Sequence, residues 1–247
     1  MRRSADRRSA CAPPATFRLR SSPRTPIRAV LIDALGTLVE LQPPAPRLRA
    51  ALLATTGCDI GAEASERGFA AEITYYLDHH MEGSDPAGLE RLRDACARVM
   101  SEAIALPDLD FAAVRDAMVA SLEFKAFRDA EPALRTLRAR GLRLVAVSNW
   151  DCSLSHWLDS AGLGELLDGA VSSAEVGEAK PAPAIFRAAL AVAGVEADEA
   201  VHVGDSMARD VAGARAAGIR PVLVMREGSG NPAVECVSSL EGVASLT

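Results

Sequence analysis

A chain of 247 residues is long enough to bury one large hydrophobic core together with a smaller inserted or appended module. Hydrophobic residues make up 49% of the chain, yet no stretch approaches the roughly 18 to 20 uninterrupted apolar residues that span a bilayer, and the amino terminus lacks the apolar block of a secretory signal. We therefore expect a soluble protein without a membrane partner. The five cysteines are scattered and form no C-x-x-C pair, which favours reduced thiols and a cytoplasmic location over a zinc or redox site.

Residues 1–26 differ in composition from the rest of the chain. They hold seven arginines and one acidic residue among many Ser, Pro and Ala, and we expect a disordered basic tail. A targeting leader and a phosphate-binding arm are the alternatives to a plain unstructured tail or an early start codon. Without this tail the net charge changes from −6 to about −12, which argues against nucleic acid as a partner.

Short apolar runs that end in a polar loop recur beyond residue 27. The runs are 29–32 before Asp33, 142–147 before Ser148, 201–203 before Gly204, and 221–225. Each fits a buried strand that ends in a loop. Helical patterns lie between them at 131–140, 182–193 and 207–217, and a glycine follows each pattern. This alternation predicts an α/β fold, a doubly wound parallel sheet with helices on both faces.

The segment 41–124 breaks this rhythm. It shows one-sided apolar stripes at helical spacing and no convincing strand, so we expect an all-helical insertion after the first strand. Such an insertion would form a cap above the strand ends, where an open parallel sheet binds its ligands.

Four short motifs occur at the predicted strand ends or just before predicted helices. They are Asp33-Ala34-Leu35-Gly36-Thr37-Leu38, Ser148-Asn149, Lys180-Pro181, and Gly204-Asp205-Ser206-Met207-Ala208-Arg209-Asp210. In this order, over residues 27 to about 225, they resemble the motifs of the haloacid dehalogenase superfamily, in the branch with a small helical cap. The resemblance implies a Rossmann-like core over 27–40 and 125–247 and a helical cap over 41–124.

The resemblance also implies a phosphatase that acts on a small phosphorylated metabolite. Asp33 would be the nucleophile that forms an aspartyl-phosphate. Magnesium would be held by Asp33, the backbone carbonyl of Leu35 and Asp205, with Asp210 in the outer shell or orienting Lys180. The residues expected to bind the phosphate are Thr37, Ser148, Asn149 and Lys180.

Lysine usage supports a catalytic role for Lys180. The chain has 25 arginines and two lysines, Lys125 and Lys180, so a lysine in this background indicates a need for a compact point charge.

Position 35 departs from the family pattern. Phosphatases of the family place a second aspartate there as general acid and base, and this chain has Leu35. A leucine transfers no proton, and loss of such an acid removes about 10²–10⁴-fold of rate. Asp151 and His156 are candidate substitutes, although solvated residues at a helix start explain them better.

Three interpretations remain open. The first is a phosphatase whose leaving group departs unaided or takes its proton from another group. The second is a 2-haloacid dehalogenase, whose first motif resembles Asp33-Ala34 but which uses no magnesium. The third is a weakened module that binds a phosphorylated metabolite or a protein partner.

Other residues in the cap and beside it carry weaker signals. His79 and His80 are adjacent on a predicted helix, so their side chains diverge by about 100° and are poorly placed to share a metal. Tyr75 and Tyr76 fit packing within the cap, and Trp150 fits either the core or the wall of a pocket.

Overall fold

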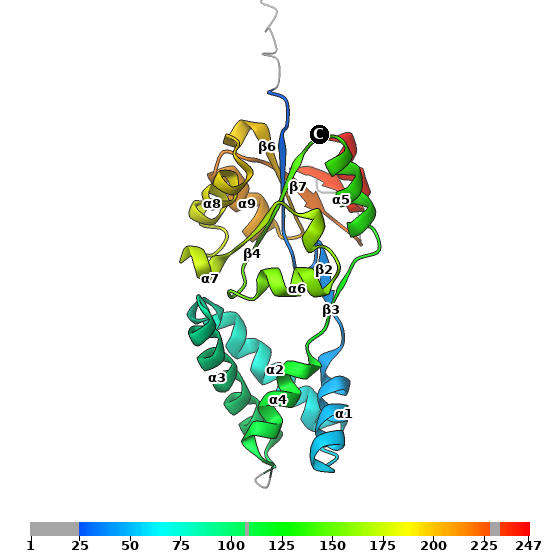
Figure 1. Ribbon diagram of the computed structural model, residues 1–247, viewed down its shortest axis with the longest axis vertical. Coiled ribbons are helices and arrows are strands. Elements are labelled where there is room, and N and C mark those ends of the chain that lie inside the picture. Colours follow the sequence, from blue (N-terminus) through cyan, green and yellow to red (C-terminus); the bar gives the residue numbers. More distant parts are fainter. Residues whose placement is uncertain (1–24, 107–108, 228–232) are drawn as a thin grey trace, which may run out of the picture.

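The computed structural model describes residues 25–106, 109–227 and 233–247. Nearly all of the tail predicted over residues 1–26 lies outside these residues. Figure 1 shows a sheet with flanking helices and, beyond its strand ends, a separate group of helices. Within the described part of the chain, no helix is both long enough and apolar enough to cross a membrane.

Six parallel strands form the central sheet, in the order β5-β4-β1-β6-β7-β8. The strands are β1 Ala29–Ile32, β4 Arg143–Ser148, β5 Gly169–Ser172, β6 Ala200–Gly204, β7 Arg220–Val224 and β8 Glu235–Val237. The runs predicted from the sequence correspond to β1, β4, β6 and β7, which confirms the parallel sheet. The prediction lacked β5 and β8.

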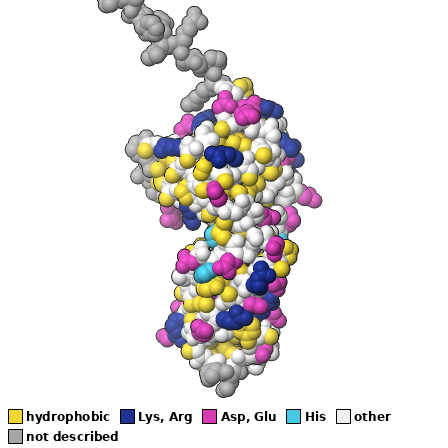
Figure 2. All heavy atoms as spheres, turned by 90° about the vertical axis from the view of Figure 1, so that its left-hand side faces the viewer, with side chains coloured by type: hydrophobic (Ala, Val, Ile, Leu, Met, Phe, Trp, Pro, Cys, Tyr) yellow, Lys and Arg dark blue, Asp and Glu magenta, His cyan; other side chains and the backbone are white. Residues whose placement is uncertain are grey.

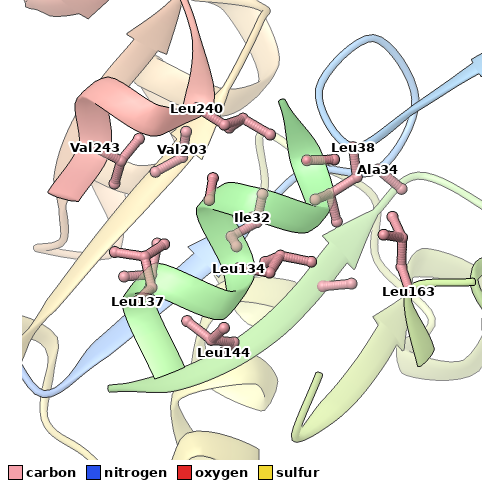
Figure 3. Packing of buried hydrophobic residues seen from close by; sticks show 14 of the residues in the cluster. Ile32, Ala34, Leu38, Leu134, Leu137, Leu144, Leu163, Val203, Leu240 and Val243 are labelled. Carbon is pink, nitrogen blue, oxygen red and sulfur yellow. The ribbon is translucent and has the colours of Figure 1, made fainter. Parts of the chain in front are cut away.

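Alternating residues of β1 bury opposite faces of the sheet. Val30 and Ile32 pack under α5 (Ala130–Ala139) and α6 (Leu154–Ser160), whereas Ala29 and Leu31 pack under α8 (Pro183–Ala193) and α9 (Ala212–Ala216). On the first face, Leu134 of α5 lies over the sheet with its neighbours in one apolar cluster (Figure 3). Because both faces are covered, β1 is apolar at every position rather than alternating.

The insertion consists of α1 Pro44–Thr56, α2 Ala62–His79, α3 Pro86–Ile104 and α4 Phe111–Ser121. Its helices surround an apolar cluster of their own, which includes Leu48, Leu92 and Met100. Figure 2 shows this group and the sheet region as two masses joined at a narrower waist. The helical cap expected from the sequence is therefore present.

The ends of the insertion differ from the prediction. Leu41 belongs to β2 (Val39–Leu41) and Phe124 to β3 (Phe124–Ala126), and these strands pair antiparallel where the chain enters and leaves the cap. The expectation of no strand within 41–124 was wrong at both ends, because strands of three residues are too short to show a period. A second difference is that the helix expected over 207–217 begins with a π-helical turn, Met207–Val211, before α9.

The sheet order explains where a site can form. After β1 the chain adds β4 and β5 on one side of it and then returns to place β6 on the other side. The carboxyl ends of the neighbouring strands β4, β1 and β6 therefore meet at a topological switch point. The residues directly after β1 and β6, Asp33 and Asp205, and the last residue of β4, Ser148, therefore share one edge of the sheet.

Candidate active site

Asp33 lies at the centre of this edge and is almost fully buried, at 5% exposure. Its carboxylate Oδ1 accepts hydrogen bonds from the Lys180 ammonium at 2.5 Å and from the Ser148 hydroxyl at 3.0 Å. Thr37 donates a longer hydrogen bond of 3.4 Å to Oδ2, and its side chain has no exposed surface. Three of the residues predicted from the motifs are thus brought together around Asp33.

Lys180 bridges two carboxylates. Its Nζ lies 2.5 Å from Asp33 Oδ1 and 2.7 Å from Asp210 Oδ1, and it also donates to the carbonyl of Val147. Burial alone would lower the pKa of Lys180, but the two carboxylates outweigh burial and raise it. The Lys180 ammonium is therefore charged and is shared between Asp33 and Asp210.

Asp210 is held from several sides. Besides Lys180, it accepts hydrogen bonds from His202 Nε2 at 3.0 Å and from the backbone N–H of Ser206 at 3.0 Å. Burial would raise the pKa of this carboxyl, but His202 and the Lys180 ammonium hold it well below its usual range. Sequence reasoning missed His202, although a histidine within an otherwise apolar strand directly before Gly204-Asp205 was a readable signal.

Asp205 completes a group of three carboxylates. One carboxylate oxygen from each of Asp33, Asp205 and Asp210 lies within 4.8 Å of the others. Burial, followed by the charges of Asp33 and Asp210, raises the pKa of Asp205. Three acids thus face one lysine, and this excess of hard oxygen ligands fits a magnesium ion. Among the described residues, no other such group of His, Cys, Asp and Glu occurs.

Glycine makes this convergence possible. Gly36 has a φ of +87°, and a Cβ at this position would lie 2.2 Å from Asp205 Oδ2. Any larger residue would therefore displace the carboxylate in addition to straining the turn.

Asn149 holds Lys180 by its backbone. The Asn149 side chain donates to the Lys180 carbonyl at 3.1 Å and accepts from the Lys180 N–H at 2.7 Å. Both ends of the amide are thus engaged, and they fix the chain from which the Lys180 side chain reaches Asp33.

A pocket of about 300 Å³ opens between this edge and the cap. Asp33, Ser148, Asn149, Lys180 and Asp210 form its floor, and Leu35 lines it with 42% of its surface exposed. The walls are largely apolar and aromatic. They comprise Leu41, Ile73, Tyr76, Leu77, Leu122, Phe124, Trp150 and Trp157.

Three hydrogen bonds join the cap to the core beside the pocket. The Tyr76 hydroxyl donates to Asp151 Oδ2 at 3.0 Å, His80 Nε2 lies 3.1 Å from Ser173 Oγ, and the Cys152 N–H donates to the carbonyl of Gly83. They hold the cap closed over the floor.

These contacts bear on the weaker sequence signals. Asp151 lines the pocket but is occupied by Tyr76 and by two hydrogen bonds from Ser153, whereas His156 is exposed and does not line it. His79 contacts Glu82 within the cap, whereas His80 contacts Ser173 of the core, so the two histidines diverge as expected.

Glu72 is the charged residue of the pocket that the sequence interpretation missed. It is 5% exposed and lies on the buried face of α2 with Ser65, Gly68 and Phe69. Its Oε2 has no hydrogen-bond partner, and burial raises the pKa of the carboxyl to about 7 although contact with the Cys96 thiol lowers it. Its position four residues after Gly68 and seven after Ser65 was the available signal.

A family model described as haloacid dehalogenase-like hydrolase matches residues 27–218. The chain belongs to this family. This match confirms the superfamily to which the four motifs pointed and the expectation of a hydrolase.

Relatives of this haloacid dehalogenase-like hydrolase include phosphatases. The chain is 32% identical to a plasmid phosphoglycolate phosphatase of Cupriavidus necator over 229 residues, 90% of this chain and 93% of the relative. It is 32% identical to the human haloacid dehalogenase-like hydrolase domain-containing protein 3, over 85% of this chain and 87% of the relative. The bovine protein of that name matches a shorter stretch at 44% identity, which spans 42% of its length.

Solved structures of two kinds resemble the hydrolase. A HAD phosphatase from Thermococcus onnurineus has a TM-score of 0.62 and 25% identity, covering 89% of this chain and 97% of that one. An L-2-haloacid dehalogenase has a TM-score of 0.64 and 26% identity, covering 90% and 99%. The shared fold therefore does not separate the two reactions, and the residues of the site must do so.

Proposed function

We propose that this hydrolase is a magnesium-dependent phosphatase of a small phosphorylated metabolite and that it acts through an aspartyl-phosphate at Asp33. The observation that carries the proposal is the group of three carboxylates, Asp33, Asp205 and Asp210, beside a buried lysine. Asp33, Asp210 and the lysine line the floor of the pocket. A pocket of about 300 Å³ has room for a small phosphate monoester.

Asp33 performs the first displacement. A carboxylate oxygen attacks phosphorus, the bond from phosphorus to the leaving oxygen breaks, and Asp33 carries the phosphoryl group as a mixed anhydride. Water then attacks phosphorus, the bond to Asp33 breaks, and inorganic phosphate leaves with the carboxylate restored. The proton that the water gives up balances the proton that the departed alkoxide takes from solvent. Lys180 and Ser148, which contact Asp33 Oδ1, stabilise the negative charge of the phosphoryl oxygens.

The metal would lie among the three carboxylates. Asp33, the carbonyl of Leu35 and Asp205 would bind it directly, and Asp210, already engaged by Lys180 and His202, would act from the outer shell. When bound, magnesium offsets the repulsion between Asp33 and the incoming phosphate.

Two of the residues assigned to phosphate binding have a positioning role in this proposal. Thr37 is fully buried beside Asp33, so it holds the loop. The Asn149 side chain holds the backbone of Lys180. The backbone of Asn149 is therefore the part of this residue that is left to face the phosphate.

Phosphate release from p-nitrophenyl phosphate tests the proposal. We expect turnover that requires magnesium and is lost in Asp33→Asn, which keeps the shape of the side chain and removes the nucleophile. The dehalogenase alternative is supported by the missing acid at Leu35 and by the structural likeness, and opposed by the Asp205 and Asp210 pair. Halide release from a 2-chloroacid without metal, with no phosphate release from any ester, would replace the phosphatase with a dehalogenase.

A further inference from the structure

The cap side of the pocket is acidic and aromatic. Glu72 from α2 and Asp151 from the loop after β4 both line it. Tyr76, Phe124, Trp150 and Trp157 line it as well, so both tryptophans of the chain are used here. The ring of Phe124 lies 4.8 Å from that of Trp150 and 5.0 Å from that of Trp157, between centroids.

The positive charges of the pocket lie on its floor. Within the described residues, Lys180 and Arg209 are the lysine and arginine side chains that line it, and both come from the core. Lys180 is shared between Asp33 and Asp210, and Arg209 acts on Asp205. Among the described residues, no lysine or arginine of the pocket therefore pairs with the carboxylates near the cap, and His80, which also lines it, is engaged by Leu77 and Ser173. The floor already provides for the phosphate.

Glu72 lacks the partner that a buried carboxyl requires. Its Oε2 is enclosed and accepts no hydrogen bond, although buried polar atoms are nearly always paired. The Cys96 thiol, a weak donor, contacts the carboxyl. Burial without a cation accounts for the raised pKa of about 7. A ligand that brings an N–H⁺ group would supply the missing donor and the missing charge together.

We propose that Glu72 determines the specificity of this site by binding an ammonium group on the leaving alcohol, so that the substrate is the phosphate monoester of a primary amino alcohol. The inference rests on the phosphatase proposed above. Aromatic faces attract such cations, and the Glu72 carboxylate adds a charge-assisted hydrogen bond. The same arrangement disfavours an ester whose leaving group carries a carboxylate, because Glu72 and Asp151 would repel it.

Three esters of matched size test the inference. They are O-phosphoethanolamine with an ammonium group, n-propyl phosphate with a methyl group and phosphoglycolate with a carboxylate. We expect kcat/KM to fall in that order, with about a tenfold or larger step from the first to the second. Glu72→Gln should lower kcat/KM for O-phosphoethanolamine by about 10- to 100-fold and change that for n-propyl phosphate less than about threefold. Glu63→Gln, an exposed carboxyl on the same helix, should keep the wild-type order.

Binding gives a second readout that does not depend on turnover. Calorimetric titration of the Asp33→Asn variant with the same esters in magnesium should show the same order, and adding Glu72→Gln should remove it. Equal affinity for O-phosphoethanolamine and n-propyl phosphate, or an equal loss for all three esters with Glu72→Gln, overturns the inference. Turnover of p-nitrophenyl phosphate without an ammonium preference would leave the phosphatase standing and reject the ammonium site. An ammonium preference in binding, with no ester hydrolysed, would leave the ammonium site standing and reject the phosphatase.

Discussion

Replacing Glu72 by glutamine should stabilise the protein above neutral pH and leave its stability almost unchanged near pH 4. In the folded protein the pKa of Glu72 is raised from 4.5 to about 7, with burial as the largest cause. Ionising this carboxyl therefore costs more in the folded state than in the unfolded state. Glutamine has nearly the same shape and never ionises.

The size of the effect follows from the pKa shift. Each unit corresponds to about 1.4 kcal/mol, so the shift amounts to about 3 kcal/mol. Because the folded pKa lies above the unfolded one, the unfolded state loses its proton first as the pH rises. The contribution of Glu72 is fully present below about pH 4.5, decreases between about pH 4.5 and 7, and is lost above that range.

Urea unfolding at about pH 4 and about pH 8, followed by tryptophan fluorescence, measures this difference. We expect Glu72→Gln to exceed the wild type by up to about 3 kcal/mol at the higher pH and to match it at the lower. Glu66→Gln, which alters an exposed carboxyl of the same helix beyond its first turn, should match the wild type at both. The same gain at both pH values, or a loss at the higher one, would refute an unfavourable buried charge at this position.

Two further substitutions test the floor of the site, each with a matched control. Lys180→Met should lower the unfolding free energy in metal-free buffer by about 3–5 kcal/mol, because two buried carboxylates lose their cation. Lys125→Met, at an exposed lysine, should change it by less than about 0.5 kcal/mol, and similar losses in both would contradict the role of the buried pair. Gly36→Ala should weaken activation by magnesium about tenfold or more, as its Cβ would meet a metal-side carboxylate at 2.2 Å. Gly141→Ala has a similar positive φ but open space around it, so an equal shift in magnesium titrations of the two variants would indicate backbone strain alone.

The floor of the site could be predicted because its residues are tied to strand ends. Asp33, Ser148 and Asp205 each follow or end a short apolar run, and parallel strands bring such positions to one edge. Lys180 required more than a pattern, since its contact with Asp33 spans 147 positions. Lys180 was identified from the order of the four motifs along the chain.

The upper wall of the site could not be predicted in the same way. Helical periodicity identifies the apolar face of a helix, but it does not tell which polar side chain beside that face is buried with it. Glu72 lies on the buried face of α2, and its contact with the Cys96 thiol of α3 depends on how the two helices pack. The strands β2, β3 and β8, of three residues each, were beyond reach for a related reason, because so few residues do not define a period. Strand β5 is as long as β1, but Gly169 and Ser172 at its ends leave it without an apolar run.

The exchange of the usual second aspartate for Leu35 bears on the same choice of substrate. Without a general acid, the rate depends on how readily the alcohol departs, and a nearby ammonium group withdraws electrons from the ester oxygen and makes it a better leaving group. Leu35→Asp should therefore raise turnover most for n-propyl phosphate, less for O-phosphoethanolamine, and least for p-nitrophenyl phosphate, whose alcohol is the most acidic. We expect a gain of about tenfold or more for the poorest leaving group, measured as kcat against Leu35→Asn, which resembles the aspartate but carries no acidic proton. Equal gains for the three esters, or the same gains in Leu35→Asn, would show that proton transfer at this position does not limit the reaction.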